Sequence, residues 1–467
     1  MRVTVMYQPR ATNRAGVMGR YTYFFATFAI LPVIVIAGVV ALFTMGKKEP
    51  GPTDAAGVEK DMQLYIEIRQ KLLDHYDGEL DETELRDAAL VGLAQGTGDR
   101  FTRVLPPVQA RAQDQDLGGG FYGIGAYIAP NDDGSIAISG LQPDGGAEKA
   151  GILVDDVIVA VDGISIIGQT YESSVARIKS NEENSIVKLT IHRGGNKTSG
   201  TDPKAMVFNF DVTRSRVVTY SIHDVHIEER DGHSYGYLQI SDINANTYDP
   251  QFKDAISELA GKGAEGFVID LRGNGGGRVN AAVDLADGLI KEADQTIVFT
   301  HSSRESNRDS DHVYKTKDAL SITDLPVIVL IDDGTASAAE IITGALKDTG
   351  RAFVIGERSY GKGIVQTIYK LQTDPNYSVN ITTTQYFTPL GRKVQKGKDG
   401  EPGGIMPDLE IRYREGERDK VRYRLRIRQA RNNRDEIAKS SSWWNQEDRM
   451  LDAALDVLNG KPVTVGP

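Results

Sequence analysis

Cysteine is absent from the 467-residue sequence, which excludes a disulfide framework and a metal site built from thiolates. The chain also has no excess of positive charge, because 65 aspartate and glutamate residues outnumber 54 lysine and arginine residues and leave a net charge of −11. Nucleic-acid-binding proteins normally carry a basic domain, so this balance argues against that class. The lack of cysteine is typical of an exported protein, which avoids unwanted disulfides.

Histidine is also scarce, with 7 residues in the chain and none after His312. His223 and His226 fall on opposite faces of a predicted strand, so neither a metal site nor another cofactor is expected. In contrast, 40% of the residues are apolar and 25% are charged, as in a globular protein. The length indicates several domains, since one domain usually takes about 100–200 residues.

The N-terminal part is predicted to be a membrane anchor. Residues 1–20 contain arginines and no acidic residue, and residues 21–45 contain no charged side chain. A run of that length spans the ~30 Å hydrocarbon core of a bilayer. The positive charge before the run predicts a cytoplasmic segment at 1–20 and an extracytoplasmic, periplasmic location for the remainder. A cleaved signal peptide is the alternative, although the run exceeds the usual ~7–15 apolar residues and no small-residue cleavage site closes it.

Residues 46–112 are predicted to form a linker and an N-terminal helical region. Apolar side chains recur near helical spacing in residues 58–76 and again in residues 82–94. This pattern predicts a hairpin of two amphipathic helices whose role is packing.

Residues 113–214 are interpreted as a β-rich PDZ-like domain. Short apolar runs separated by glycine turns extend from Phe121 to Gly163, in an order that resembles the PDZ domains of proteases. The resemblance implies that the loop Tyr122-Gly123-Ile124-Gly125 binds the C-terminal carboxylate of a peptide. The glycines allow an anion-binding nest of N–H groups, and the strand that follows can pair with an extended peptide. Residues 194–203 are predicted to form a surface hairpin insertion.

Residues 215–411 alternate between strand-like and helix-like patterns, which predicts an α/β core with largely parallel strands. One predicted strand ends at Asp270 and leads into the glycine cluster at 273–277. The cluster lacks the lysine and the serine or threonine of a P-loop, so nucleotide binding is not favoured. The glycine cluster is better explained as the source of a backbone N–H that binds an oxyanion, because glycine allows the substrate to approach the backbone closely.

Ser337 is the candidate nucleophile. It follows the apolar run 326–331 and opens a predicted helix, where N–H groups and the helix dipole favour negative charge. The alternative is that Ser337 only caps this helix. Because no histidine follows Ser337, the Ser–Asp–His order of α/β-hydrolases is excluded. Asp332 and Asp333 are assigned to the turn before the helix and not to an acid–base pair.

Lys362 is the candidate base, and it lies between two glycines and between two predicted strands. A lysine acts as a base only where burial or a cationic neighbour lowers its pKa. The alternative is a solvated surface charge. Gln366 lies four residues further on, so in an extended segment its amide would share a face with the amine and orient it.

Five motifs follow one another in this part of the chain. They are Asp270-Leu-Arg-x-Asn-x-Gly-Gly, Thr335-Ala-Ser337-Ala-x-Glu340-Ile341, Gly356-Glu-x-x-Tyr-Gly-Lys362-Gly-x-x-Gln366, Thr388-Pro-x-Gly391-Arg392 and Gly404-Ile-x-Pro407-Asp408. In this order they resemble the motifs of the C-terminal processing peptidases, also called tail-specific proteases. With the PDZ-like module, the resemblance covers about residues 58–411.

The resemblance implies a crotonase-like α/β core with an inserted PDZ domain, acting as a serine endopeptidase on proteins with free C-terminal tails. It makes Ser337 the nucleophile that forms an acyl-enzyme, Lys362 the general base, and Gln366 the residue that positions the base. The backbone N–H groups of Ala338 and Gly276 would form the oxyanion hole.

The sequence departs from the family pattern near both parts of this site. Thr335 and Ala339 replace neighbouring serines and leave the matched nucleophile in place. Gly273 replaces the more usual asparagine after the arginine, a change that would loosen its loop. Neither departure removes a catalytic group.

Residues 412–467 are predicted to be a charged helical extension that ends in an amphipathic helix at 448–458. Self-association through Trp443-Trp444 is the alternative to a merely solvated extension, so a homo-oligomer stays an option. The favoured interpretation is a membrane-anchored serine endopeptidase. Its rivals are a noncatalytic binding protein that works through the PDZ-like domain and a scaffold assembled through the C-terminal helices.

Overall fold

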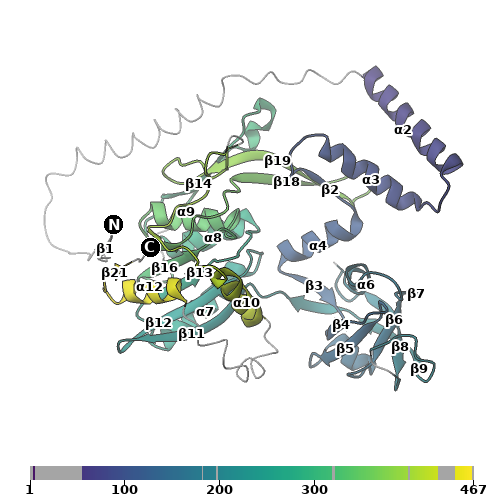
Figure 1. Cartoon of the computed structure of the whole chain (residues 1–467), viewed down its shortest axis with the longest axis horizontal. Coiled ribbons are helices and arrows are strands. Elements are labelled where there is room, and N and C mark those ends of the chain that lie inside the picture. The colour runs from purple at the N-terminus through teal and green to yellow at the C-terminus, as the bar shows by residue number, and fades with distance from the viewer. Residues whose placement is uncertain are drawn as a thin grey trace. The chain divides into compact units, whose positions relative to one another are not determined.

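The computed structural model describes residues 4–5, 55–180, 182–195, 198–317, 321–397, 400–429 and 448–464 (Figure 1). The chain divides into two compact units, the first made of residues 1–105, 222–242 and 252–467 and the second of residues 106–221 and 243–251. The predicted anchor at 21–45 lies outside the described residues. Within the described ranges, no helix is both long enough and apolar enough to span a membrane.

The first unit contains a six-stranded sheet in the order β11-β12-β13-β16-β17-β20. β11 and β12 are antiparallel, and every pair from β12 to β20 is parallel. The central strands β13 and β16 are buried along their whole length, as expected for apolar strands covered on both faces. The predicted α/β core with largely parallel strands is therefore confirmed. The strands are β11 Ile222–Arg230, β12 His233–Ile240, β13 Phe267–Asp270, β16 Val327–Ile331, β17 Ala352–Gly356 and β20 Leu409–Glu410.

Helices connect these strands and pack against the sheet. α8 and α9 contact each other and follow β13 and β16, respectively. α12 belongs to the C-terminal extension, and its Met450 and Leu455 join Val268 and Leu330 in one core cluster. The amphipathic helix predicted at 448–458 is thus confirmed. The helices are α7 Lys253–Gly261, α8 Val279–Leu289, α9 Ala338–Asp348, α10 Glu417–Gln429 and α12 Arg449–Leu458.

A second sheet in the first unit has the order β15-β14-β19-β18, and β2 also pairs with β19. Its strands come from distant parts of the sequence, since β2 lies before the second unit's strands and the others lie after them. This pairing attaches residues 103–105 to the core. The strands are β2 Arg103–Leu105, β14 Thr296–His301, β15 His312–Lys315, β18 Ile364–Lys370 and β19 Ser378–Phe387.

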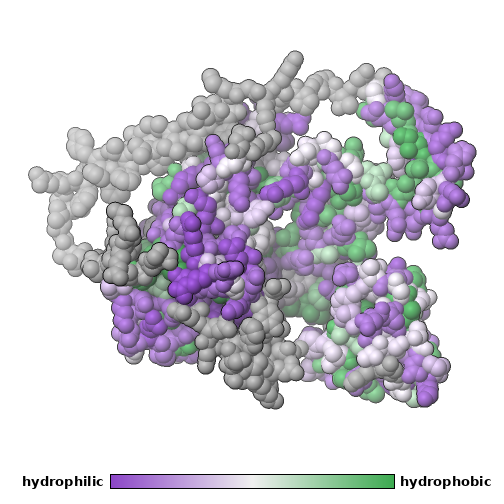
Figure 2. Space-filling view, viewed as in Figure 1, coloured by the Kyte–Doolittle hydropathy of each residue, from purple (hydrophilic) through white to green (hydrophobic). Residues whose placement is uncertain are grey.

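The two predicted N-terminal helices are confirmed as α2 Ala55–His75 and α3 Glu82–Gln95. An ion pair between Arg69 and Glu82 links them. The prediction that α2 packs its apolar face within the chain is wrong, because Ile66 and Ile68 on this helix are each 59% exposed. Figure 2 shows an apolar stripe, coloured green, along this helix. Sequence periodicity located the helix correctly but could not show whether a partner covers its apolar face.

The second unit contains a six-stranded antiparallel sheet in the order β4-β5-β6-β8-β9, with β7 paired to β6. Its core is a cluster that includes Ile136, Ile158 and Leu189. The strands on either side of the insertion predicted at 194–203, β8 and β9, pair along their full length, so a hairpin at this position is confirmed. The elements are α4 Pro107–Gly118, β3 Gly120–Gly123, β4 Ala126–Pro130, β5 Ile136–Leu141, α5 Gly146–Ala150, β6 Val157–Val161, β7 Ile164–Ser165, α6 Tyr171–Ile178, β8 Ile186–Arg193, β9 Met206–Thr213 and β10 Ser215–Val218.

Candidate active site

Ser337 lies at the turn from β16 into α9 and is the N-cap residue of that helix. Its φ of 56° and ψ of −121° belong to a region that residues other than glycine rarely adopt. The residue is partly exposed, whereas Ala336 and Ala338 on either side are buried. This strained turn presents a serine at the start of a helix, where the N–H groups favour negative charge.

The carboxylate of Glu340 connects the segment of Ser337 with that of Lys362. Its Oε2 accepts the backbone N–H of Ser337 at 2.8 Å and that of Lys362 at 2.9 Å. Its Oε1 accepts the N–H of Gly361 at 2.7 Å and the hydroxyl of Ser359 at 2.6 Å. Burial raises the pKa of Glu340, although the four hydrogen bonds favour its charged form. The two segments are therefore held together at their backbones.

Tyr386 on β19 bridges the same two segments from another side. Its hydroxyl lies 2.9 Å from the carbonyl oxygen of Ser337 and 2.8 Å from that of Lys362. The hydroxyl has one proton, so it donates to one of these carbonyls at a time. Burial, with the nearby Glu340, raises the pKa of Tyr386 well above its usual range, which keeps the phenol a donor.

The sequence analysis gave no role to Glu340 or to Tyr386. A signal for Glu340 was present, because Ser337-x-x-Glu340 has the spacing of a capping box, in which the glutamate accepts the N–H of the N-cap residue. No comparable local signal exists for Tyr386, since its contact with Ser337 joins residues 49 positions apart.

Lys362 lies in the loop before β18 and is partly buried. Burial lowers the pKa of its amine, the charges of Arg103 and Arg100 lower it further, and Glu340 opposes them. A lowered pKa is what a lysine needs to act as a base. In the described part of the chain, Lys362 Nζ makes no hydrogen bond to the Ser337 hydroxyl. Such contacts are often long before a substrate binds.

Gln366 lies on β18, two residues after the start of the strand, whereas Lys362 precedes the strand. Nε2 of Gln366 donates to the backbone carbonyl of Phe101 at 2.6 Å. The ring centre of the same Phe101 lies 5.2 Å from Nζ of Lys362. Whether Gln366 orients the amine of Lys362 during the reaction stays a prediction.

The glycine cluster lies directly against the Ser337 turn. A Cβ atom added to Gly276 would lie 2.7 Å from the Cβ of Ser337 and 2.9 Å from the nitrogen of Ala338. The N–H of Gly276 donates to Oδ1 of Asn274 at 2.8 Å, while the carbonyl of Asn274 accepts the N–H of Ala336 at 2.9 Å. The structure thus brings together Gly276, Ser337 and Ala338, although the Gly276 N–H already has a partner.

Gly273, expected to loosen its loop, is held in place by a hydrogen bond. It adopts a φ of 72°, and its N–H donates to Oδ1 of Asp332 at 2.9 Å. The same oxygen accepts the N–H of Gly334 at 2.9 Å. Asp332 therefore stabilises the turn before the nucleophile and the glycine loop beside it, in line with its assignment to turn chemistry.

We expect Gly276→Ala to lower kcat by about a hundredfold or more, the loss typical of a damaged oxyanion hole. The residue has a φ of 99°, and an added Cβ would collide with the backbone of Ala336 and Ala338. Gly275→Ala is the control, because a Cβ at Gly275 meets no atom within 4 Å. Hydrolysis of quenched casein by both variants checks this expectation, and equal losses would contradict it.

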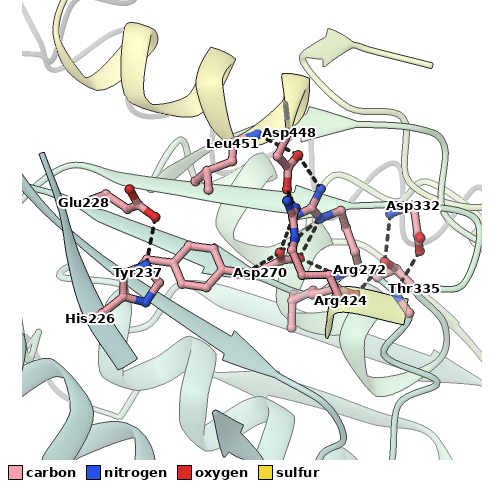
Figure 3. A network of polar contacts seen from close by, with 12 residues as sticks. His226, Glu228, Tyr237, Asp270, Arg272, Asp332, Thr335, Arg424, Asp448 and Leu451 are labelled. Atoms are coloured by element: carbon pink, nitrogen blue, oxygen red, sulfur yellow. Dashed lines mark hydrogen bonds and ion pairs between the residues drawn. The ribbon is translucent and has the colours of Figure 1, made fainter. Parts of the chain in front are cut away.

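A buried ion-pair network holds the start of the glycine loop (Figure 3). Arg272 is 2% exposed. Its guanidinium donates to Asp270 at the end of β13 and to both oxygens of Asp448, the latter two at 2.9 Å each. Arg424 also donates to Asp448, and the hydroxyl of Tyr237 donates to Asp270 at 2.7 Å. Burial alone would raise the pKa of Asp448, but Arg272 and Arg424 hold it well below its usual range.

The C-terminal extension also contacts the acidic turn before Ser337. Arg422 on α10 donates to Asp333 at 2.6 Å and approaches Asp332 at 3.4 Å. Arg418, also on α10, pairs with Asp333 and donates to Glu357 at 2.7 Å. The basic residues of α10 thus neutralise carboxylates that adjoin the site.

His226, also labelled in Figure 3, lies on β11 next to Tyr237. Burial disfavours its charged form, but hydrogen bonds with Asp224 and Glu228 outweigh burial and raise the pKa of His226 to about 9. His223 instead lies 3.1 Å from the hydroxyl of Ser241. Among the described residues, no three acidic or histidine side chains are grouped to hold a metal ion.

The predicted peptide-binding loop lies in the second unit. Tyr122 and Gly123 belong to β3, and the N–H of Tyr122 donates to the carbonyl of Ser180 at 3.0 Å. Gly125 has a φ of 69°, and Ile124 is buried. β4, which follows this loop, is an edge strand of its sheet, so its outer side suits the addition of a peptide strand.

Comparisons with known proteins agree with these features. Residues 234–411 match the model of peptidase family S41, and residues 138–193 match the PDZ domain. The carboxy-terminal processing protease CtpA of Bacillus subtilis is 30% identical over 388 residues, which are 82% of this chain and 76% of that protein. A carboxyl-terminal-processing protease of Picosynechococcus is 32% identical over 73% of this chain and 76% of its own length. Among solved structures, the photosystem II D1 C-terminal processing protease is 28% identical over 75% of this chain and 88% of that chain, with a TM-score of 0.40.

Proposed function

The chain belongs to peptidase family S41, beside the carboxy-terminal processing proteases, and from this membership we propose that it cleaves proteins through a Ser337–Lys362 dyad. The observation that carries the proposal is the carboxylate of Glu340, whose Oε2 accepts the backbone N–H groups of both residues. This contact supports a site in which a serine at a helix start and a lysine of lowered pKa act together.

In the proposed reaction, the neutral amine of Lys362 takes the proton of the Ser337 hydroxyl as the oxygen attacks the carbonyl carbon of the substrate. The Ala338 N–H and the glycine loop at Gly276 stabilise the oxyanion. The C–N bond then breaks, the proton passes from Lys362 to the leaving amine, and an acyl-enzyme remains. Water attacks this ester with Lys362 again as the base, which releases Ser337 and the second product.

The proposal extends to substrate recognition. The loop Tyr122-Gly123-Ile124-Gly125 would bind the terminal carboxylate of a substrate, while β4 pairs with the residues before it. An edge strand beside a glycine loop supports this role, because a peptide can add there with its backbone hydrogen-bonded. The substrates would be proteins with free, extended C-terminal tails.

We include the location and the fold of the core in the same proposal. The uncharged run at 21–45, preceded by arginines, would anchor the chain in the cytoplasmic membrane with the catalytic part on the periplasmic side. The parallel strands from β12 to β20 are compatible with the crotonase-like core that the motifs imply.

Tail recognition is tested with an unstructured protein that ends either in a free carboxylate or in a carboxamide. We expect the full-length chain to cleave the amidated form about ten- to a hundredfold less efficiently, because hydrogen bonds to a charged group contribute about 1.5–3 kcal/mol. Mass spectrometry of the new termini gives the rates. Gly125→Ala should reduce this difference, since a Cβ there would lie 2.8 Å from the backbone of Gly145. Equal cleavage of both forms by the unaltered chain would remove tail recognition from the proposal.

A further inference from the structure

A short segment that leads into β2 and includes its first residue, residues 99–103, contacts the proposed base; we refer to it as the 99–103 arm. The carboxylate of Asp99 accepts the N–H groups of Phe101 and Thr102 at 3.1 and 3.2 Å, which folds the arm into a turn. It also accepts the hydroxyl of Thr382 on β19 at 2.6 Å. Hydrogen bonds to the Asp99 carboxylate outweigh burial and lower its pKa, so it is charged at neutral pH. The arm is thus fastened to the catalytic core by side-chain contacts as well as by the pairing of β2 with β19.

Phe101 contacts two members of the proposed catalytic group. The centre of its ring lies 5.2 Å from Nζ of Lys362. Its backbone carbonyl accepts the Nε2 hydrogen of Gln366 at 2.6 Å. The residue therefore covers the amine with an apolar face and holds the amide that was expected to orient it.

Arg100 connects the arm to the loop that carries Lys362. Its guanidinium donates to the hydroxyl of Tyr360 at 2.9 Å and lies 4.6 Å from the ring centre of Phe101. The backbone N–H of Tyr360 in turn donates to the carbonyl of Thr335, two residues before the nucleophile, at 2.9 Å. The arm contacts the lysine loop through Tyr360 as well as through Phe101.

We propose that the 99–103 arm is part of the active site, in which Phe101 is a positioning residue for Gln366 and Lys362 and Arg100 fastens the arm to the loop that carries Lys362. This inference rests on the proposed Ser–Lys mechanism and adds to it a segment that lies outside the residues matching the peptidase family.

Charged groups reach Lys362 from several elements. Arg100 on the arm and Arg103 on β2 disfavour a positive amine, whereas Glu340 on α9 favours it. Tyr386 on β19 is uncharged at neutral pH because its pKa is raised. Burial is the largest influence and acts in the same direction as the two arginines. Because Arg100 and Arg103 are both exposed, added salt should screen their charges and weaken their influence on the pKa of Lys362.

The first test replaces Arg103 with glutamine in the full-length chain. Loss of this positive charge raises the pKa of Lys362, so less neutral amine is present at neutral pH and the rising limb of kcat/KM against pH moves to higher pH. We expect roughly a three- to tenfold loss at pH 7 and recovery at high pH. Arg69→Gln makes the same change in net charge on α2 and should leave the profile in place. A profile that does not move for Arg103→Gln, or that moves equally for Arg69→Gln, would overturn the electrostatic role.

The same titration can be followed without proteolysis. In a Ser337→Ala background, the rate at which acetic anhydride modifies Lys362 reports the fraction of neutral amine at each pH, and mass spectrometry measures it. Adding Arg103→Gln should shift the midpoint to higher pH. If the Ser337→Ala chain still cleaves casein, the Ser–Lys mechanism fails; if the midpoint stays in place, the inference about the arm fails. The two failures are therefore distinguishable.

The positioning role of Phe101 needs a second measurement. Phe101→Ala should lower kcat/KM by roughly ten- to a hundredfold, the loss expected when a reacting group shifts by about 1 Å. Phe101→Tyr keeps the ring and should restore most of the activity. Phe101→Ala keeps the carbonyl that accepts the Gln366 amide and removes only the ring beside Lys362. Because the ring and the amide are both expected to position the same amine, the losses in Phe101→Ala and Gln366→Ala should not add in the double variant. Fully additive losses, or no rescue by tyrosine, would overturn this role.

Discussion

Replacing Ser337 or Lys362 with alanine is expected to lower kcat for casein hydrolysis by about 10⁴-fold, the size of effect seen when a nucleophile or its base is removed. Without the hydroxyl no acyl-enzyme forms, and without the amine the hydroxyl keeps its proton. Both side chains lie on backbone held by Glu340 and Tyr386, which alanine retains. The variants should therefore fold normally, with unchanged circular dichroism and thermal unfolding.

The double variant makes this expectation sharper. Ser337 and Lys362 are proposed to act in the same step, so removing either one already abolishes the rate enhancement that they provide together. The double variant Ser337→Ala with Lys362→Ala should therefore have about the same kcat as either single variant. Lys262→Ala is a control, because it removes a solvent-exposed lysine paired with Glu258 on the surface of α7. A Lys362→Ala chain as active as the Lys262→Ala chain would contradict the assignment of the base.

Asp448→Ala is expected to destabilise the chain by about 3 kcal/mol, the lower end of the range for breaking a buried ion pair, because the variant removes one of two carboxylates that pair with a buried guanidinium. The guanidinium belongs to Arg272, which is 2% exposed, lies at the start of the glycine loop and keeps Asp270 as a partner. Urea unfolding at neutral pH measures the loss. Asp231→Ala is the control, because Asp231 pairs with Lys461 at the surface and such pairs contribute little. Equal unfolding midpoints for the two variants would show that the buried network is not needed.

The pH dependence of this contribution follows from the direction of the pKa shift. The pKa of Asp448 is lower in the folded chain than in the unfolded chain, because Arg272 and Arg424 favour its charged form. Its contribution to stability is therefore complete above the unfolded pKa of about 3.9 and is lost as the pH falls toward the folded pKa. Between pH 5 and pH 8 the difference between Asp448→Ala and the unaltered chain should be constant.

Features that depend on residues close together in the chain could be predicted from the sequence. Apolar strands alternating with helices predicted the α/β core, and the segments around Ser337 and Lys362 each carried a local motif. Turn chemistry at Asp332 was also predictable, because its partner Gly334 is two residues away.

Contacts between distant segments could not be predicted. Arg272 and Asp448 are 176 residues apart, and Gln366 and Phe101 are 265 residues apart. No periodicity or spacing connects such residues, since their contact depends on how β2, β18 and α12 pack in the folded unit. The register shift in the pairing of β18 with β19 is a similar case, because it appears only once the two strands are paired.

The link between Asp448 and Arg272 has a consequence for the order of events during synthesis. The ribosome produces Asp448 after Ser337, Lys362 and the glycine loop, so a nascent chain that already carries the whole dyad still holds Arg272 without this carboxylate. The glycine loop therefore lacks one of the contacts that stabilise it as long as synthesis of the chain is incomplete. The chain would thus reach its full activity only after the segment that carries Asp448 has been made and has paired with Arg272.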